Sequence, residues 1–207
     1  MKLYHSFTSP FVRKALVIAH ELSLVDRITL HTEPTGALKT GLAVTNANPL
    51  SKIPTLTLDD GQTTLYDSRV ICEYLDSLGG GKFFPQGEKR WEALRRQALA
   101  DGIMDAAIIV MLERMNRTPE MRSQEWIDAQ LRKVDLGLDA FEAEAKEGKL
   151  AGPENMTIGE ITLVVALGWF DLRFGDRDWR VGRPALTEFV KKFEGRGSFE
   201  ATKPPAS

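Results

Sequence analysis

The chain has 207 residues, of which 43% are hydrophobic and 27% are charged, and its formal net charge is -2 at pH 7. This composition is typical of a protein with a packed core, and it excludes an intrinsically disordered chain. The chain has 27 basic and 29 acidic residues and no long basic run, so we expect no nucleic-acid partner.

The sequence also argues against a membrane protein and a secreted protein. Its most apolar stretch, 161–170, is about half of the roughly 20 residues that a membrane span needs, so it predicts a buried helix. Residues 1–5 lack the apolar core of a signal peptide, and a single Cys72 cannot form a disulfide framework. We therefore expect a cytoplasmic protein without a membrane-spanning segment.

The first strand and helix patterns lie at the start of the chain. Residues 2–5 predict a strand, and Ser9-Pro10 then opens a stretch whose apolar residues recur at helical spacing as far as Leu22. Residues 27–32 alternate as a second strand would. Because a helical crossover commonly joins parallel strands, this pattern predicts a βαβ unit.

A hairpin and a helix follow after a stretch without a clear pattern. Residues 36–54 are poorly patterned and rich in turn residues, which predicts a loop. Two short β-prone runs, 55–58 and 63–66, flank an Asp-Gly turn signal and predict antiparallel strands. Asp67-Ser68 then begins an amphipathic helix, so the first third of the chain reads βαβ-ββα.

The remainder of the sequence is helical in character. Residues 79–87 are rich in glycine and predict a connection between domains. Two long helices are expected over 88–146 with a break at 116–119, and a capping box at 157–160 begins the apolar helix. A last helix follows Arg183-Pro184. We predict an α/β domain over 1–78, a linker over 79–87 and an all-α domain over 88–207.

Three segments resemble, in order and spacing, the signatures of glutathione transferases, most closely those of bacteria: 8–14, 48–56 and 67–75. The resemblance implies a thioredoxin-like domain in front of a helical bundle. It further implies an enzyme of detoxification that conjugates reduced glutathione to a small apolar electrophile, without a further cofactor, usually as a homodimer. A non-catalytic glutathione-binding or protein-interaction module, and a glutathione-dependent peroxidase, are the alternatives.

The resemblance assigns the catalytic role to Ser9. A hydroxyl at a helix N-terminus, where the helix dipole also favours an anion, can stabilise the glutathione thiolate. From the residues alone, a serine before Pro10 is more often an ordinary helix cap. Thr8 is the alternative donor. Because Ser9 and Val12 replace the two cysteines of glutaredoxins, dithiol chemistry is excluded.

Two further motifs would hold the rest of glutathione. By resemblance, Ile53-Pro54 forms a cis peptide whose backbone pairs with that of the ligand, although most X-Pro bonds are trans. Lys52 and Lys39 would pair with the glycine carboxylate, although lysines in polar loops are usually solvated surface charges.

The same resemblance makes Asp67 a partner for the γ-glutamyl ammonium and Ser68 a partner for its carboxylate. Both could otherwise be simple helix caps. For the second substrate the candidates are apolar residues that are individually more often core than pocket lining: Phe11, Met104, Ile108, Met111 and Trp169. The three histidines have no ligand spacing, so we expect no metal site.

Overall fold

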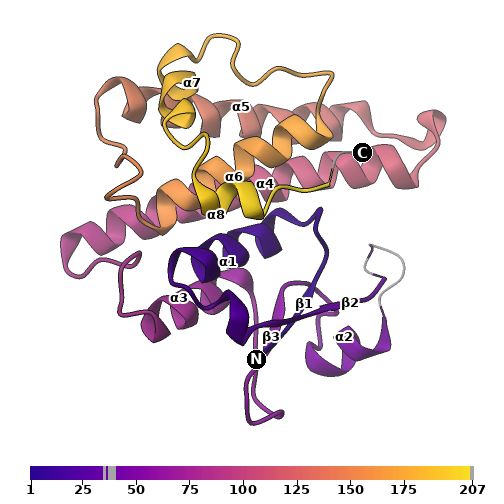
Figure 1. Ribbon diagram of the computed structural model, residues 1–207. Helices are drawn as coiled ribbons and strands as arrows, with labels where there is room; N and C mark the ends of the chain where they lie inside the picture. The colour runs from indigo at the N-terminus through magenta and orange to yellow at the C-terminus, as the bar shows by residue number, and fades with distance from the viewer. Residues whose placement is uncertain (35, 37–40, 206–207) are drawn as a thin grey trace. The chain divides into compact units, whose positions relative to one another are not determined.

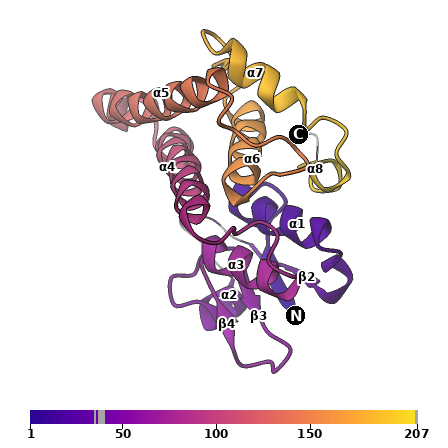
Figure 2. The same cartoon turned by 90° about the vertical axis from the view of Figure 1, so that its left-hand side faces the viewer.

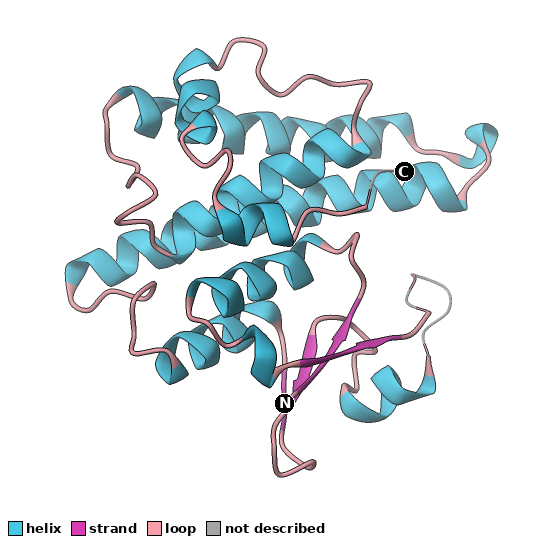
Figure 3. Ribbon diagram, in the orientation of Figure 1, coloured by secondary structure: helices cyan, strands magenta, loops and turns pink. Residues whose placement is uncertain are grey.

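The computed structural model describes residues 1–34, 36 and 41–205. Within this part of the chain, every strand lies in the N-terminal third and the remainder is helical (Figure 3). The architecture is a thioredoxin-like domain with a mixed sheet together with a helical domain, as the sequence predicts. No helix among the described residues is both long enough and apolar enough to cross a membrane.

Four strands form one mixed sheet in the order β2-β1-β3-β4. β1 pairs with β2 in parallel, whereas β1 with β3 and β3 with β4 are antiparallel, which confirms the predicted βαβ unit and hairpin. The strands have these bounds: β1 Lys2–His5, β2 Thr29–Thr32, β3 Thr55–Thr57 and β4 Thr64–Leu65.

Helices cover both faces of this sheet (Figure 1). α1 (Pro10–Glu21) packs beside α3 (Ser68–Leu78) on the face to which the buried Leu3 and Leu56 point. α2 (Leu42–Ala47) lies on the opposite face, within a stretch that the sequence predicts as loop. Of its six residues only Val44 is buried, so the segment carries too little apolar periodicity to predict a helix.

A 3-10 turn lies directly before the second strand, which therefore begins later in the sequence than predicted. It covers Val25–Arg27, so β2 begins at Thr29 rather than at the predicted residue 27.

The second unit contains four α-helices, of which the first three are long: α4 Glu88–Asn116, α5 Gln124–Lys146, α6 Ile158–Arg173 and α7 Pro184–Lys191. α4 packs against both α5 and α6 (Figure 2). The predicted capping box at the start of α6 is confirmed, because Thr157 Oγ1 accepts from Gly159 N and Glu160 Oε2 accepts from Thr157 N. The break between α4 and α5 contains a 3-10 turn, Pro119–Met121.

The C-terminal segment differs from the sequence-based domain bounds. The chain divides into a first unit of Met1–Phe84 with Gly195–Ser207 and a second unit of Pro85–Glu194. The short α8 (Gly197–Ala201) packs against α1, and Arg196 forms two hydrogen bonds, 2.6 and 2.8 Å long, to the Glu21 carboxylate. These partners are 175 residues apart in sequence, so local patterns could not place the segment with the first unit.

Candidate functional site

Three loops meet at one edge of the sheet because β1, β3 and β4 alternate in direction. β1 ends at His5, β3 starts at Thr55, and Tyr4 of β1 lies opposite Thr55. β4, antiparallel to β3, ends at Leu65 on the same edge. The loop that carries Ser9, the turn before Thr55 and the start of α3 therefore lie at this edge, all within the first unit.

Ser9 is the N-cap of α1. Its backbone is extended, with φ -83° and ψ 121°, and its Oγ accepts a long hydrogen bond of 3.4 Å from Val12 N. A hydroxyl has one proton and two lone pairs, so this cap occupies a lone pair and leaves the proton able to donate to another group. Ser9 is half-buried, as is Thr8, whose Oγ1 lies 3.2 Å from Ser6 Oγ.

The turn before β3 contains the cis peptide bond Ile53–Pro54 that the family resemblance implies. A buried pair of side chains holds this turn. Asn48, 1% exposed, donates from Nδ2 to the Lys52 carbonyl and to Thr55 Oγ1, both at 3.0 Å. Thr55 Oγ1 itself donates to the same carbonyl at 2.8 Å. These three hydrogen bonds therefore fix the backbone of the turn at residues 52–54.

Sequence reasoning missed the roles of Asn48 and Thr55. Asn48 Oδ1 accepts a hydrogen bond from Leu50 N, which forms an asparagine turn. The Asn-Pro pair in the sequence is the signal that could have predicted this turn. The Lys52 side chain, one of the predicted site residues, is exposed. Lys39, the other predicted cation, lies outside the described residues.

Asp67 and Ser68 begin α3. Asp67 is exposed, caps the helix and accepts from Arg69 N at 2.9 Å through Oδ1. Ser68 is 3% exposed in the first turn, where backbone amides and the helix dipole favour a carboxylate. The arrangement presents one carboxylate side chain and one anion-favouring helix end side by side.

A buried histidine lies directly before the Ser9 loop. His5 is 2% exposed; its Nε2 lies 2.8 Å from Thr32 Oγ1, and its ring packs edge-on against Phe7. Burial, and to a lesser extent the nearby His31, lower the pKa of His5, so its ring is neutral at neutral pH. The ring supports the loop through packing, a role that no sequence motif indicated.

The candidates for the second substrate belong to both units. Phe11, Ile108 and Met111 are half-buried. Met104 and Trp169, which are 1% and 2% exposed, belong to the interior.

The sequence matches the glutathione S-transferase N-terminal domain over residues 8–78 and the glutathione S-transferase C-terminal domain over residues 124–192. The "Uncharacterized GST-like protein YibF" of Escherichia coli (strain K12) is 31% identical, and the match covers 99% of each chain.

Solved structures agree with these matches. A glutathione transferase family member from Pseudomonas fluorescens Pf-5, with bound glutathione, has a TM-score of 0.92 at 38% identity over 99% of each chain. A glutathione S-transferase from Methylobacillus flagellatus KT, with GSH bound, has a TM-score of 0.83 at 35% identity over 98% of each chain. Because both parts of the sequence match and the relatives span nearly its whole length, this chain belongs to the glutathione S-transferase family.

Proposed function

We propose that the protein is a glutathione transferase in which Ser9 stabilises the thiolate of reduced glutathione for attack on apolar electrophiles. The observation that carries this proposal is the geometry of the α1 cap. Ser9 Oγ is held at the helix N-terminus as an acceptor, and its proton is not used by that cap. A thiol has a reference pKa of about 8.5, so activation at neutral pH requires such a donor.

The reaction needs only the two substrates. The glutathione thiol loses its proton to solvent, and Ser9 Oγ–H donates to the resulting sulfur anion. The thiolate then forms a carbon–sulfur bond to the electrophile, whose leaving group departs with its bonding electrons. A hydrogen bond to a charged group contributes about 1.5 to 3 kcal/mol, which corresponds to a thiol pKa lowered by about one to two units.

The remaining polar groups of the sheet edge would bind glutathione along its length. The Asp67 carboxylate, whose Oδ1 caps α3, would bind the γ-glutamyl ammonium through Oδ2, and the α3 N-terminus at Ser68 suits the γ-glutamyl carboxylate. The backbone at Ile53 would pair with the peptide of the ligand, and the Lys52 ammonium with its glycine carboxylate. Lys39 remains a predicted second cation.

Relatives support glutathione as the ligand. The Pseudomonas fluorescens structure, 38% identical to this chain, was solved with glutathione and also with S-(propanoic acid)-glutathione. We further propose that the half-buried Phe11 contributes to the site of the electrophile. We also propose that the protein is a cytoplasmic homodimer. Light scattering would measure its mass in solution and so test the oligomeric state.

The test is to measure the affinity for glutathione and the pKa of the bound thiol together, from thiolate ultraviolet absorbance against pH. Wild type is compared with Ser9→Ala and Ser9→Gly. Both variants lose the donor, but glycine is a better helix cap than alanine, so the pair separates the donor from the cap. Ser77→Ala is the matched control, because Ser77 Oγ donates to Tyr74 O at the far end of α3. Thr8→Val tests the alternative donor.

We expect the bound thiol pKa to lie about one to two units below that of free glutathione in wild type and Ser77→Ala, and to return towards the free value in both Ser9 variants. Turnover of electrophiles should fall in parallel. Binding without a lowered pKa would contradict thiolate activation and support a non-catalytic module. A lowered pKa with peroxide reduction but no conjugation would support the peroxidase alternative.

A further inference from the structure

A row of polar side chains crosses the sheet on the face that α2 covers. Lys2 lies opposite Thr57, and Thr57 lies opposite Thr64, so these three residues form one row across β1, β3 and β4. Successive residues of a strand face opposite sides, so the neighbouring Leu3 and Leu56 point to the other face, where α1 and α3 pack. One face is thus a leucine core and the other is polar.

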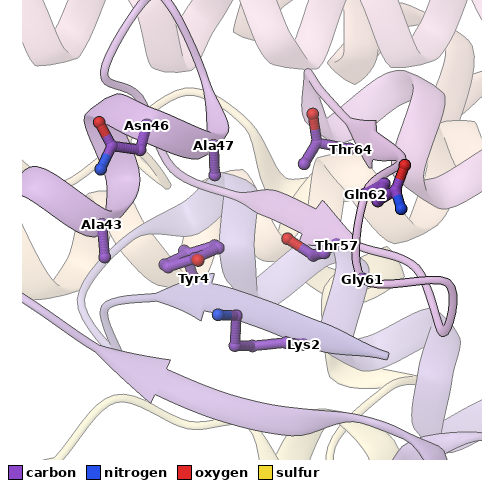
Figure 4. A pocket seen from close by; sticks show the side chains of 9 residues that line it. All are labelled: Lys2, Tyr4, Ala43, Asn46, Ala47, Thr57, Gly61, Gln62 and Thr64. Atoms are coloured by element: carbon purple, nitrogen blue, oxygen red, sulfur yellow. The ribbon is translucent and has the colours of Figure 1, made fainter.

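The polar row forms one wall of a cavity of about 330 Å³ beneath α2 (Figure 4). The opposite wall comes from α2, where Ala43 and Ala47 present only methyl groups. The lining residues belong to the first unit and comprise Lys2, Tyr4, Ala43, Asn46, Ala47, Thr57, Gly61, Gln62 and Thr64. The volume is at the lower end of the range for small-molecule sites, which suits a compact ligand.

The cavity carries positive charge without a compensating acid among its described lining residues. The Lys2 ammonium lies 4.8 Å from the centroid of the Tyr4 ring, a cation–π contact that keeps the ammonium at this wall. The two acids of the adjacent hairpin are already engaged. Asp59 pairs with the N-terminal amine, and Asp60 accepts from Gln62 N and from the Thr63 hydroxyl.

We propose that this cavity binds a small oxyanion, either a phosphoryl or a carboxylate group. The Lys2 ammonium supplies the counter-charge, and the Thr57 and Thr64 hydroxyls supply neutral donors beside it. Hydrogen bonds between an ammonium and an oxyanion are stronger than neutral ones, so Lys2 contributes most of the affinity. None of the described residues proposed for glutathione lines the cavity, so the two sites are separate and can be filled together.

The experiment is a titration of the full-length protein with inorganic phosphate, and separately with acetate, at constant ionic strength. Backbone amide shifts in nuclear magnetic resonance spectra report the binding. We expect saturable shifts at Gly61, Gln62 and Ala47, and dissociation constants that are unchanged by saturating glutathione. Binding of phosphate alone assigns a phosphoryl ligand, binding of acetate alone a carboxylate, and binding of both a general oxyanion site.

Two variants and a control locate the interaction. Lys2→Gln should weaken binding about tenfold or more, because it removes the charge-assisted contact. Ala47→Leu keeps the charge but fills the cavity, and it should also weaken binding. Lys89→Gln removes an exposed charge from α4 and should have no effect. Equal affinity in Lys2→Gln and wild type, no effect of Ala47→Leu, loss of the shifts when glutathione binds, or no saturable binding of either anion would each overturn the proposal.

Discussion

Asp76, near the end of α3, holds the turn that follows this helix, and substituting it tests how much that turn contributes to stability. Its side chain is 2% exposed, and its carboxylate accepts hydrogen bonds from three successive backbone amides. Oδ1 accepts from Lys82 N and Phe83 N at 2.9 Å each, and Oδ2 accepts from Phe84 N at 3.1 Å. One acidic side chain thus fixes the whole turn that follows α3.

Asp76→Asn changes the charge and one acceptor but almost no volume. The asparagine oxygen can still accept from two amides, whereas its NH₂ group cannot accept from Phe84 N. Losing one charge-assisted hydrogen bond costs about 1.5 to 3 kcal/mol, and turning the other two into neutral bonds costs about 1 kcal/mol each. We therefore expect the free energy of unfolding to fall by about 3.5 to 5 kcal/mol and the melting temperature by about 7 to 20 °C.

The measurement is urea unfolding followed by circular dichroism and by tryptophan fluorescence. Asp26→Asn is the matched control, because Asp26 is exposed in the 3-10 turn after α1 and should change stability by less than about 0.5 kcal/mol. If Asp76→Asn were no more destabilising than Asp26→Asn, the three amide contacts would contribute nothing measurable to stability, which would contradict this prediction.

Further predictions concern helix packing and pH. Gly159→Ala should destabilise the protein by about 1 to 3 kcal/mol, because a Cβ there would lie 2.7 Å from Arg96 Cβ. Gly102→Ala, with no atom within 4 Å, should stabilise it by up to about 1 kcal/mol; equal urea midpoints for the two variants would contradict this packing. Burial alone would raise the pKa of Glu21, but Arg196 and a neighbouring serine hydroxyl hold it below the ordinary 4.5. The contribution of the ionised Glu21 carboxylate to the free energy of unfolding is therefore complete above about pH 4.5. It disappears as the pH falls through the pKa that Glu21 has in the folded protein. Glu21→Gln should lose less stability than wild type between pH 4.5 and more acidic pH. The same dependence of the free energy of unfolding on pH in both proteins would contradict this prediction.

The sequence predicted those parts of the fold that local patterns determine. Alternation, the Asp-Gly turn and the helix caps gave the order of strands and helices, and the Thr157 capping box was found in place. The predicted elements do not by themselves bring the ends of β1 and β4 together, because this also requires the antiparallel pairing of β1 with β3, which no local pattern determines. The loops after β1 and β4 carry Ser9 and Asp67, so their common location follows from this pairing.

Other features depend on contacts between distant residues and were not foreseeable. Arg196 reaches Glu21 across 175 positions, which puts the C-terminal segment with the first unit. Asn48 and Thr55 hold the Lys52 carbonyl only once the turn has folded. The cavity beneath α2 depends on strand register, since a shift by one residue would turn its lysine and threonines to the leucine face.

The cap of α1 and the proposed chemistry of Ser9 reinforce each other. Pro10 has no backbone N–H, so the first amides that the helix start can offer are those of later residues, and Val12 N is directed to Ser9 Oγ. A hydroxyl that accepts a hydrogen bond becomes a better donor, because linked hydrogen bonds polarise one another. The chain from Val12 N through Ser9 Oγ to the sulfur would therefore strengthen as negative charge develops on the thiol. The contact that begins the helix would also prepare the hydroxyl for the proposed thiolate, so the cap and the proposed catalytic role of Ser9 are compatible.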